Sequence, residues 1–344
     1  LVINPVTGQL ITITANSDKK TYDGTPLTNN GFSFTEGVLA ADDKLTAVIE
    51  GSATNVGDEG KNVVKSYAVK RGETDVTKNY TFGNSIDGKL TINPRTVTLT
   101  SETASKEYDG TPLTKPVVTV TGQGFVAGEV TGITATGSVT FVDDGEVPNA
   151  ITYTEGANYK ESNYTITKNE GKLSITKRTD IIVITTPTRS RAYNGSKLLD
   201  YQCTYTGTIA EGDELIMTFP EDDGLINAGS KPNQYERYRV ERKSDGRDVT
   251  NNYTFGESII GTLTVTPVAI ELTAASASKA YDGTPLTNSN YTITKGAFVG
   301  EEGLAAVTIA GSQTLVGTSA NTITGHTLKD NTLAQNYTIT YQPG

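Results

Sequence analysis

The chain has 344 residues, more than one ordinary hydrophobic core accommodates, so its length predicts two to four domains. The formal net charge of -10 argues against a nucleic-acid partner, which needs a clustered basic face, and a single Cys excludes an intrachain disulfide. Hydrophobic residues make up only 35% and Trp is absent, while Thr, Tyr and Gly are abundant. These residues suit half-buried strands and tight turns, so the composition predicts an all-β fold.

Apolar, Thr-rich and partly alternating segments predict an opening strand in each of four related units, at residues 10–14, 96–100, 181–185 and 269–273. In the first unit, further strands are predicted at residues 32–35, 45–50, 63–70, 80–82 and 89–92. Short strands at this spacing are typical of a small antiparallel sandwich, either Ig-like or β-grasp-like.

A turn motif, Lys-x-Tyr-Asp-Gly-Thr-Pro-Leu-Thr, follows three of the opening strands, at residues 20–28, 106–114 and 279–287. A degenerate copy, RAYNGSKLL, occupies residues 191–199, and we expect a different turn there. The central residues of the four copies are Tyr22, Asp23, Gly24; Tyr108, Asp109, Gly110; Tyr193, Asn194, Gly195; and Tyr281, Asp282, Gly283. The Asp-Gly pair predicts a tight turn. We expect each Tyr to bury its ring and to donate its hydroxyl to backbone, with a ligand surface as the alternative.

Two further landmarks recur in the same order. Asn-Tyr-Thr begins at Asn79, Asn163, Asn252 and Asn336, and in the first three copies a closing strand follows at residues 88–92, 171–175 and 261–265. We expect each Asn to bond a turn backbone, although each also lies in a glycosylation sequon. Before it comes an apolar residue, an acidic turn and then Leu or Val, at residues 38–45, 125–130, 209–215 and 298–304.

These landmarks divide the chain into repeat 1 (residues 10–94), repeat 2 (95–177), repeat 3 (178–267) and repeat 4 (268–344). Residues 1–9 resemble the closing strand of a preceding repeat, because LVINP at 1–5 matches LTINP at 90–94, and repeat 4 lacks its closing strand. The array is therefore expected to continue in both directions. Short joints, two containing Pro, limit bending and predict an elongated rod of four tandem β-sandwich-like repeats.

No catalytic, cofactor-binding or metal-binding residue is predicted. Acidic clusters at residues 42–43, 143–144, 211–214, 221–223 and 301–302 lack the spacing of a calcium loop, so solvated acidic turns are favoured over calcium sites. His326 is the single His and is expected in an exposed loop, which leaves no zinc or Ser-His-Asp site.

Three other features have simple interpretations. The locally basic residues 235–247 predict a strand with a charged outer face. Lys20, Lys106 and Lys279 precede the turns and would be the donors if a Lys–Asn or Lys–Asp isopeptide crosslink formed, for which an Asn lies late in each unit. Arg191 in the third unit would leave that unit unlinked. No apolar run approaches the roughly 18 residues that a membrane span needs.

In each unit the turn motif is followed by Asn-Tyr-Thr, and in three units also by a segment such as Gly-Lys-Leu-Thr-Ile. This combination resembles the YDG and MBG-type repeats of Gram-positive cell-surface adhesins. The resemblance covers essentially the whole chain and implies an extracellular, β-rich stalk or adhesive region of a cell-wall protein, without catalytic residues or cofactors. We therefore expect a stalk that projects an adhesive head. The alternative is an array that binds host glycans or mucin-like glycoproteins by weak multivalent contacts. The other expected partners are neighbouring repeats, within a monomer.

Overall fold

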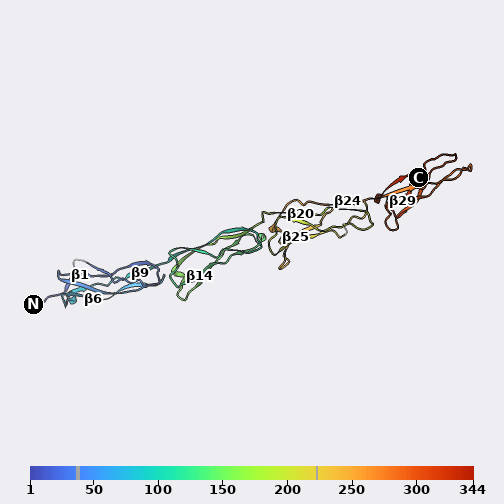
Figure 1. The fold of residues 1–344 in the computed structure, drawn as a ribbon. Helices are drawn as coiled ribbons and strands as arrows, with labels where there is room; N and C mark the ends of the chain where they lie inside the picture. Colours follow the sequence, from blue (N-terminus) through green and yellow to red (C-terminus); the bar gives the residue numbers. More distant parts are fainter. Residues whose placement is uncertain (36–38, 222–223) are drawn as a thin grey trace. The chain divides into compact units, whose positions relative to one another are not determined.

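The computed structural model describes residues 1–35, 39–221 and 224–344. In these residues, helical structure is limited to short 3-10 turns: η1 Thr77–Asn79, η2 Val142–Asp144, η3 Glu161–Asn163, η4 Thr250–Asn252 and η5 Ala334–Asn336. The other regular elements are strands, which confirms the all-β prediction (Figure 1). Val38 of the first acidic-turn landmark, and Asp222 and Asp223 of one acidic cluster, lie outside the described residues.

The chain divides into two compact units. Unit 1 comprises Leu1–Lys106, Thr111–Thr140 and Asp144–Ile175, and unit 2 comprises Glu107–Gly110, Phe141–Asp143 and Thr176–Gly344. The division into four sandwich-like repeats remains a prediction, and the repeat numbers are used below only as names for the residue ranges given above.

Repeat 1 begins with β1, which pairs in parallel with β8, and β2, which pairs with β4. A five-stranded sheet has the order β3-β9-β6-β5, and β7 is added to β6. The strands are β1 Val6–Ile11, β2 Ile13–Ala15, β3 Asp18–Thr21, β4 Phe32–Phe34, β5 Asp43–Glu50, β6 Gly60–Arg71, β7 Thr74–Asp75, β8 Tyr80–Phe82 and β9 Gly88–Asn93.

Repeat 2 has the sheets β13-β10-β18, β11-β19-β16, β12-β15 and β14-β17. Its strands are β10 Arg95–Ser101, β11 Ala104–Glu107, β12 Leu113–Thr114, β13 Val118–Gly122, β14 Val130–Ala135, β15 Ser138–Val139, β16 Val147–Pro148, β17 Ile151–Glu155, β18 Tyr164–Asn169 and β19 Lys172–Thr176.

Unit 2 contains the sheets β22-β20-β26, β21-β27-β24 and β23-β25 of repeat 3, and β29-β28-β32 and β30-β31 of repeat 4. The strands of repeat 3 are β20 Ile181–Thr185, β21 Arg189–Ala192, β22 Thr204–Thr206, β23 Asp213–Thr218, β24 Gly229–Pro232, β25 Arg237–Arg242, β26 Thr254–Phe255 and β27 Thr262–Thr266. Those of repeat 4 are β28 Val268–Ala274, β29 Tyr291–Lys295, β30 Leu304–Ala310, β31 Thr322–Leu328 and β32 Tyr337–Gln342.

The sheets are mixed, whereas the sequence predicted purely antiparallel pairing. In repeats 2 to 4 the opening strand lies between an antiparallel neighbour and a parallel one: β10 lies between β13 and β18, β20 between β22 and β26, and β28 between β29 and β32. The parallel partner follows Asn-Tyr-Thr, near the end of the repeat. Parallel partners need a long crossover, which the intervening strands of each repeat supply.

The buried cores cross the predicted repeat boundaries. In unit 1 one core joins Tyr22 and Leu90 of repeat 1 to Leu99 and Tyr164 of repeat 2. In unit 2 a core joins residues of repeats 3 and 4 in the same way. Only Pro94 separates β9 from β10, so the alternating buried side chains of the two strands form one continuous layer.

One Asn ties together three loops in each repeat, and we call it the clamp asparagine; it is buried in repeats 1 to 3 and half-buried in repeat 4. Asn149 donates its Nδ2 to the carbonyls of Glu102 (3.1 Å) and Lys115 (2.9 Å), and its Oδ1 accepts the amide of Gly137. The clamp asparagines are Asn62, Asn149, Asn233 and Asn321, and each donates to two backbone carbonyls. The sequence analysis missed them because the residues around them differ.

Replacing the clamp asparagine in Asn149→Ala should lower the free energy of unfolding of unit 1 by about 1–3 kcal/mol, because two backbone carbonyls lose the donor that the buried side chain supplies. The matched control is Asn169→Ala at the exposed end of β18, which should change it by less than about 0.5 kcal/mol. Thermal unfolding by calorimetry measures both. Equal effects of the two substitutions would exclude a clamping role.

Candidate functional site

The candidate functional site is the inter-repeat joint, at which the three sequence landmarks meet. In unit 1, Tyr22 of the turn motif donates its hydroxyl to Glu129 Oε1 at 2.5 Å, and Tyr164 donates to Glu129 Oε2 at 2.7 Å. Their ring centroids are 5.6 Å apart and nearly perpendicular, an edge-to-face contact. Glu129 is only 4% exposed, so two tyrosine hydroxyls from different repeats hold one buried carboxylate.

Backbone geometry brings the turn close to the next repeat. The amide of Tyr22 bonds the carbonyl of Asn93 at the end of β9, and Gly24, two residues later in the turn, has φ +79°. A Cβ on Gly24 would lie 3.1 Å from Val126 Cγ1, so a larger residue would be strained and crowded. The motif therefore needs Tyr for the joint and Gly for close approach.

Repeats 3 and 4 form the same joint within unit 2. Tyr193 donates to Glu302 Oε1 at 2.5 Å, and Tyr337 donates to Glu302 Oε2 at 2.6 Å. The prediction of a different turn in the degenerate copy is wrong: Gly195 has φ +76°, and Asn194 Oδ1 accepts the amide of Ser196, as Asp23 does for Thr25. Asn has a side-chain oxygen in the same place as Asp, so the turn persists.

A third joint in unit 2 uses Asp in place of Glu. Tyr108 and Tyr253 both donate to Asp213 Oδ2 at 2.7 Å. Arg242 donates to Asp213 Oδ1 at 3.3 Å, to Tyr108 Oη at 3.0 Å and to the carbonyl of Gly110 at 2.9 Å. The predicted strand within residues 235–247 is confirmed as β25, but Arg242 at its end faces the joint and not solvent.

The asparagines of Asn-Tyr-Thr make a second contact in each joint. Asn163 Oδ1 accepts the amide of Val56, Asn252 that of Val142, and Asn336 that of Ala228, at 2.7–2.8 Å. As predicted, each bonds a turn backbone, but the turn belongs to the preceding repeat in the sequence. All three asparagines are buried, and Asn79 of repeat 1 is exposed.

The tyrosine predictions are correct only in part. Tyr22, Tyr108 and Tyr193 bury their rings, but their hydroxyls bond carboxylates and not backbone. Tyr281 is 65% exposed, against the expectation of burial. The tyrosines of Asn-Tyr-Thr have a backbone partner as well as a carboxylate: the amide of Val126, for example, donates to Tyr164 Oη at 3.0 Å.

Two predictions about exposed polar residues are wrong. The acidic turns are not simply solvated, because Asp43 and Asp213 are each 7% exposed and accept tyrosine hydroxyls. His326 lies half-buried in β31, where its Nδ1 bonds the hydroxyl of Tyr341. In the residues that the structure describes, no three His, Cys, Asp or Glu side chains are grouped to hold a metal ion.

The lysines considered for crosslinks bond their own turns. Lys20 Nζ donates to Asp23 Oδ1 at 2.7 Å and to Thr25 Oγ1 at 2.8 Å. The bond from Lys20 is the main cause that lowers the pKa of Asp23 to about 2. Lys279 makes the same bonds to Asp282 and Thr284. These ammonium groups therefore stabilise the turns in which they lie.

The acids that accept tyrosine hydroxyls, three buried and Glu302 half-buried, were the main residues that the sequence analysis missed. A shared local signal marks them: the amide of each acid bonds the carbonyl three residues earlier. The pairs are Asp43 with Ala40, Glu129 with Val126, Asp213 with Ala210, and Glu302 with Val299. The acidic-turn landmark contained this spacing, but it did not distinguish the buried acid from its exposed neighbours.

Comparison with known proteins finds no family model and no curated protein that matches this chain. Of the residues described, none belongs to a helix long and apolar enough to span a bilayer.

Removing one hydroxyl from the joint should destabilise unit 1. We expect Tyr22→Phe to cost about 1.5–3 kcal/mol, the range for hydrogen bonds to charged groups, because buried Glu129 loses a donor. The matched control is Tyr67→Phe on β6, whose 39% exposed side chain should make the change nearly neutral. A double-mutant cycle with Glu129→Gln, followed by denaturant unfolding, isolates the pair. Additive effects would mean that the two groups are not coupled.

The joint should also weaken at alkaline pH. Burial, followed by the bond to Glu129, raises the pKa of Tyr22 to about 12, and burial also raises the pKa of Tyr164. The unfolded chain releases these protons near pH 10, so stability is complete below about pH 10 and falls as pH rises towards about 12. Melting temperatures across this range should fall less steeply for Tyr22→Phe than for the unchanged chain. Parallel curves would show that Tyr22 does not contribute to the loss.

Proposed function

We propose that this chain is a non-catalytic segment of tandem repeats in the stalk of a bacterial cell-surface protein, and that each repeat is fastened to the next by the inter-repeat joint. The observation that carries the proposal is the recurrence of one arrangement, Tyr–carboxylate–Tyr, around the buried Glu129 and Asp213 and the half-buried Glu302. A joint that buries a carboxylate resists opening, because water or other donors must replace the lost hydrogen bonds.

Short connections support the proposal of four sandwich-like repeats in an extended rod. Only Pro94 separates β9 from β10, and only Pro267 separates β27 from β28. A linker of one fixed-φ residue leaves little freedom for bending. Arg95 adds a further restraint within unit 1, with bonds to the carbonyls of Gly124 (2.7 Å) and Tyr22 (3.3 Å).

The stalk is better supported than the alternative of an adhesive array. A glycan-binding array should present an exposed aromatic side chain at matching positions of several repeats. The turn-motif tyrosine would be the natural candidate, but Tyr22, Tyr108 and Tyr193 are buried in joints. The proposed extracellular, cell-wall location depends on the resemblance of the turn motif to YDG and MBG-type repeats.

Small-angle scattering tests the extended arrangement. A rod of four such repeats should be on the order of 120–160 Å long and have a radius of gyration of roughly 40 Å, because strands advance about 3.3 Å per residue. A compact globule of this length would have a radius of gyration of roughly 20 Å. A value near the second figure would contradict the rod.

A joint variant distinguishes a stiff rod from a flexible chain. We expect Glu129→Ala to broaden the distribution of interatomic distances, while Glu155→Ala at an exposed position of β17 should leave it unchanged. A glycan-array screen of the same chain tests the alternative, because specific binding would favour the adhesive array.

A further inference from the structure

The first and last segments of a repeat pair with each other in parallel. In repeat 3 these segments are residues 181–192 and 254–266, in which β20 pairs with β26 and β21 pairs with β27, both in parallel. A parallel bridge between Thr185 and Ile259 joins the two strand pairs. The two segments therefore run side by side in one direction, and we call them the parallel ribbon.

The parallel ribbon recurs in the other repeats. In repeat 1, β1 pairs with β8 and β3 with β9, both in parallel, and a parallel bridge between Thr14 and Ile86 lies between them. In repeat 2, β10 pairs in parallel with β18, and β11 lies beside β19. In repeat 4, β28 pairs in parallel with β32. The ribbon is therefore a property of the repeat and not of one copy.

Two hydroxyls close a break in the ladder of the ribbon, which in repeat 3 lies between β20 and β21. Oγ1 of the buried Thr186 accepts the amide of Gly261 at 2.8 Å, and Thr188 Oγ1 accepts the amide of Thr262 at 3.1 Å. Glycine allows this close approach, because a Cβ on Gly261 would lie 2.4 Å from the carbonyl of Pro187. The segments thus stay bonded where the backbone ladder is interrupted.

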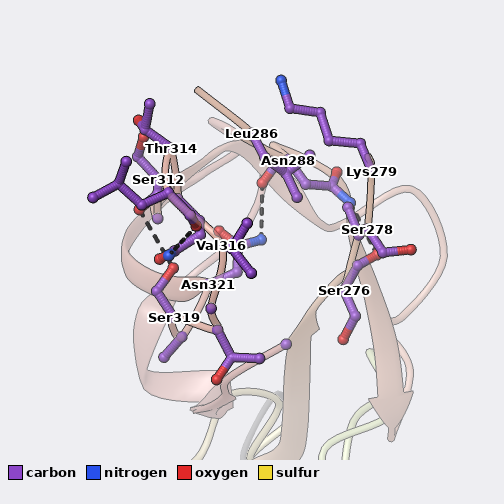
Figure 2. Close-up of a pocket in the computed structure, with 18 of the residues that line it drawn as sticks. Ser276, Ser278, Lys279, Leu286, Asn288, Ser312, Thr314, Val316, Ser319 and Asn321 are labelled. Carbon is purple, nitrogen blue, oxygen red and sulfur yellow. Dashed lines mark hydrogen bonds between the residues drawn. The ribbon is translucent and has the colours of Figure 1, made fainter. Parts of the chain in front are cut away.

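The clamp asparagine bridges the same break. Asn233 Nδ2 donates to the carbonyl of Pro187 at 3.0 Å on one segment, and its backbone amide donates to the carbonyl of Gly261 at 2.8 Å on the other. In repeat 4, Asn321 donates to the carbonyl of the residue that follows β28 and to that of Asn288 (Figure 2). The clamp and the hydroxyls together make the ribbon continuous.

The ribbon is also anchored in the core. Alternate side chains of both segments in repeat 3 are buried: Ile182 and Ile184 on the first, and Leu263 and Val265 on the second. Sliding one segment along the other would pull these apolar side chains out of their packing, which is unfavourable in proportion to the apolar area exposed.

The path of the chain decides how tension reaches the ribbon. The chain enters repeat 3 at the start of one segment, near Ile181, and leaves it at the end of the other, at Thr266. Because the segments are parallel, these points lie at opposite ends of the ribbon, on the order of 40 Å apart at about 3.3 Å per residue. Tension along the chain therefore pulls the segments in opposite directions and loads all the bonds between them together. The strands β22 to β25 lie between the segments in the sequence, so tension reaches them only after the ribbon has opened.

We infer that the parallel ribbon is the load-bearing element of each repeat, and that it keeps the repeat folded under tension applied along the chain. Bonds that are loaded together must break together, whereas bonds loaded from one end break one pair at a time. Forced unfolding is governed by the rate of crossing this barrier and not by the free energy of unfolding alone. The inference deepens the proposed stalk, on which it rests for the source of the tension.

Single-molecule force spectroscopy of the 344-residue chain tests the direction of the resistance. Handles on Ile181→Cys and Thr266→Cys load the ribbon along its length, and handles on Ser190→Cys and Thr266→Cys peel it from one end. These three positions are exposed, and Cys203→Ser in both variants removes the one native thiol. We expect the first pair to withstand a several-fold higher tension at the same loading rate. Equal tensions for the two pairs would overturn the inference.

Two threonine variants, made with the first pair of handles, separate mechanical from thermodynamic stability. Thr186→Val removes the acceptor of a backbone amide within the ribbon, and Thr250→Val removes the acceptor of the Val240 amide, also at 2.8 Å, outside it. We expect both to lower the free energy of unfolding in solution. At constant tension, Thr186→Val should speed unfolding about ten-fold or more and Thr250→Val by less than about three-fold. Equal acceleration by the two variants would contradict a special role of the ribbon.

The outcome is distinguishable from a failure of the proposed stalk. A rod in scattering whose two pairs of handles give equal tensions would retain the stalk and reject the load-bearing ribbon. A globule in scattering with unequal tensions would reject the extended stalk and retain the ribbon.

Discussion

A carboxylate buried at the junction of two repeats is the interaction on which the rest of the architecture depends. Burying a charge is costly unless donors compensate it, and here the donors are two tyrosine hydroxyls from different repeats. The identity of the acid correlates with its surroundings. Glu129 and Glu302 each bond two hydroxyls through separate oxygens, whereas the shorter Asp213 receives both hydroxyls on one oxygen and Arg242 on the other.

This constraint explains why the sequence repeat and the packed core do not coincide. The repeat has the turn-motif tyrosine in its first third, but the ring of Tyr22 completes a core that includes Leu99 and Tyr164 of the following repeat. Each core thus depends on both neighbours, as nearest-neighbour interfaces do in other repeat proteins. Changes at one joint are expected to affect the stability of two repeats.

Local structure was predictable from the sequence, whereas the partners of the polar side chains were not. Opening strands such as residues 181–185 follow from alternation and Thr content, and the turn at Gly195 follows from Asn-Gly. The partner of Tyr22 lies 107 residues away, and a backbone carbonyl would have satisfied its hydroxyl equally well. Asn149 was missed because a clamp asparagine can be recognised only by its three hydrogen bonds to residues that are distant in the sequence. The residues that flank the four clamp asparagines differ from one repeat to the next, so they give no sequence signal.

The joint is directional, and this property limits how such repeats can be combined. One side contributes a Tyr and a close-approaching Gly, and the other contributes an acid, a second Tyr and an Asn. Two identical sides cannot pair, so contacts are heterologous and propagate in one direction. Repeat 3 shows how little of the turn motif the joint requires: Arg191 and Lys197 replace Lys and Pro of the motif, yet Tyr193 and Gly195 keep the contact with repeat 4. The remaining motif residues stabilise the turn, and they can vary as long as it presents the tyrosine.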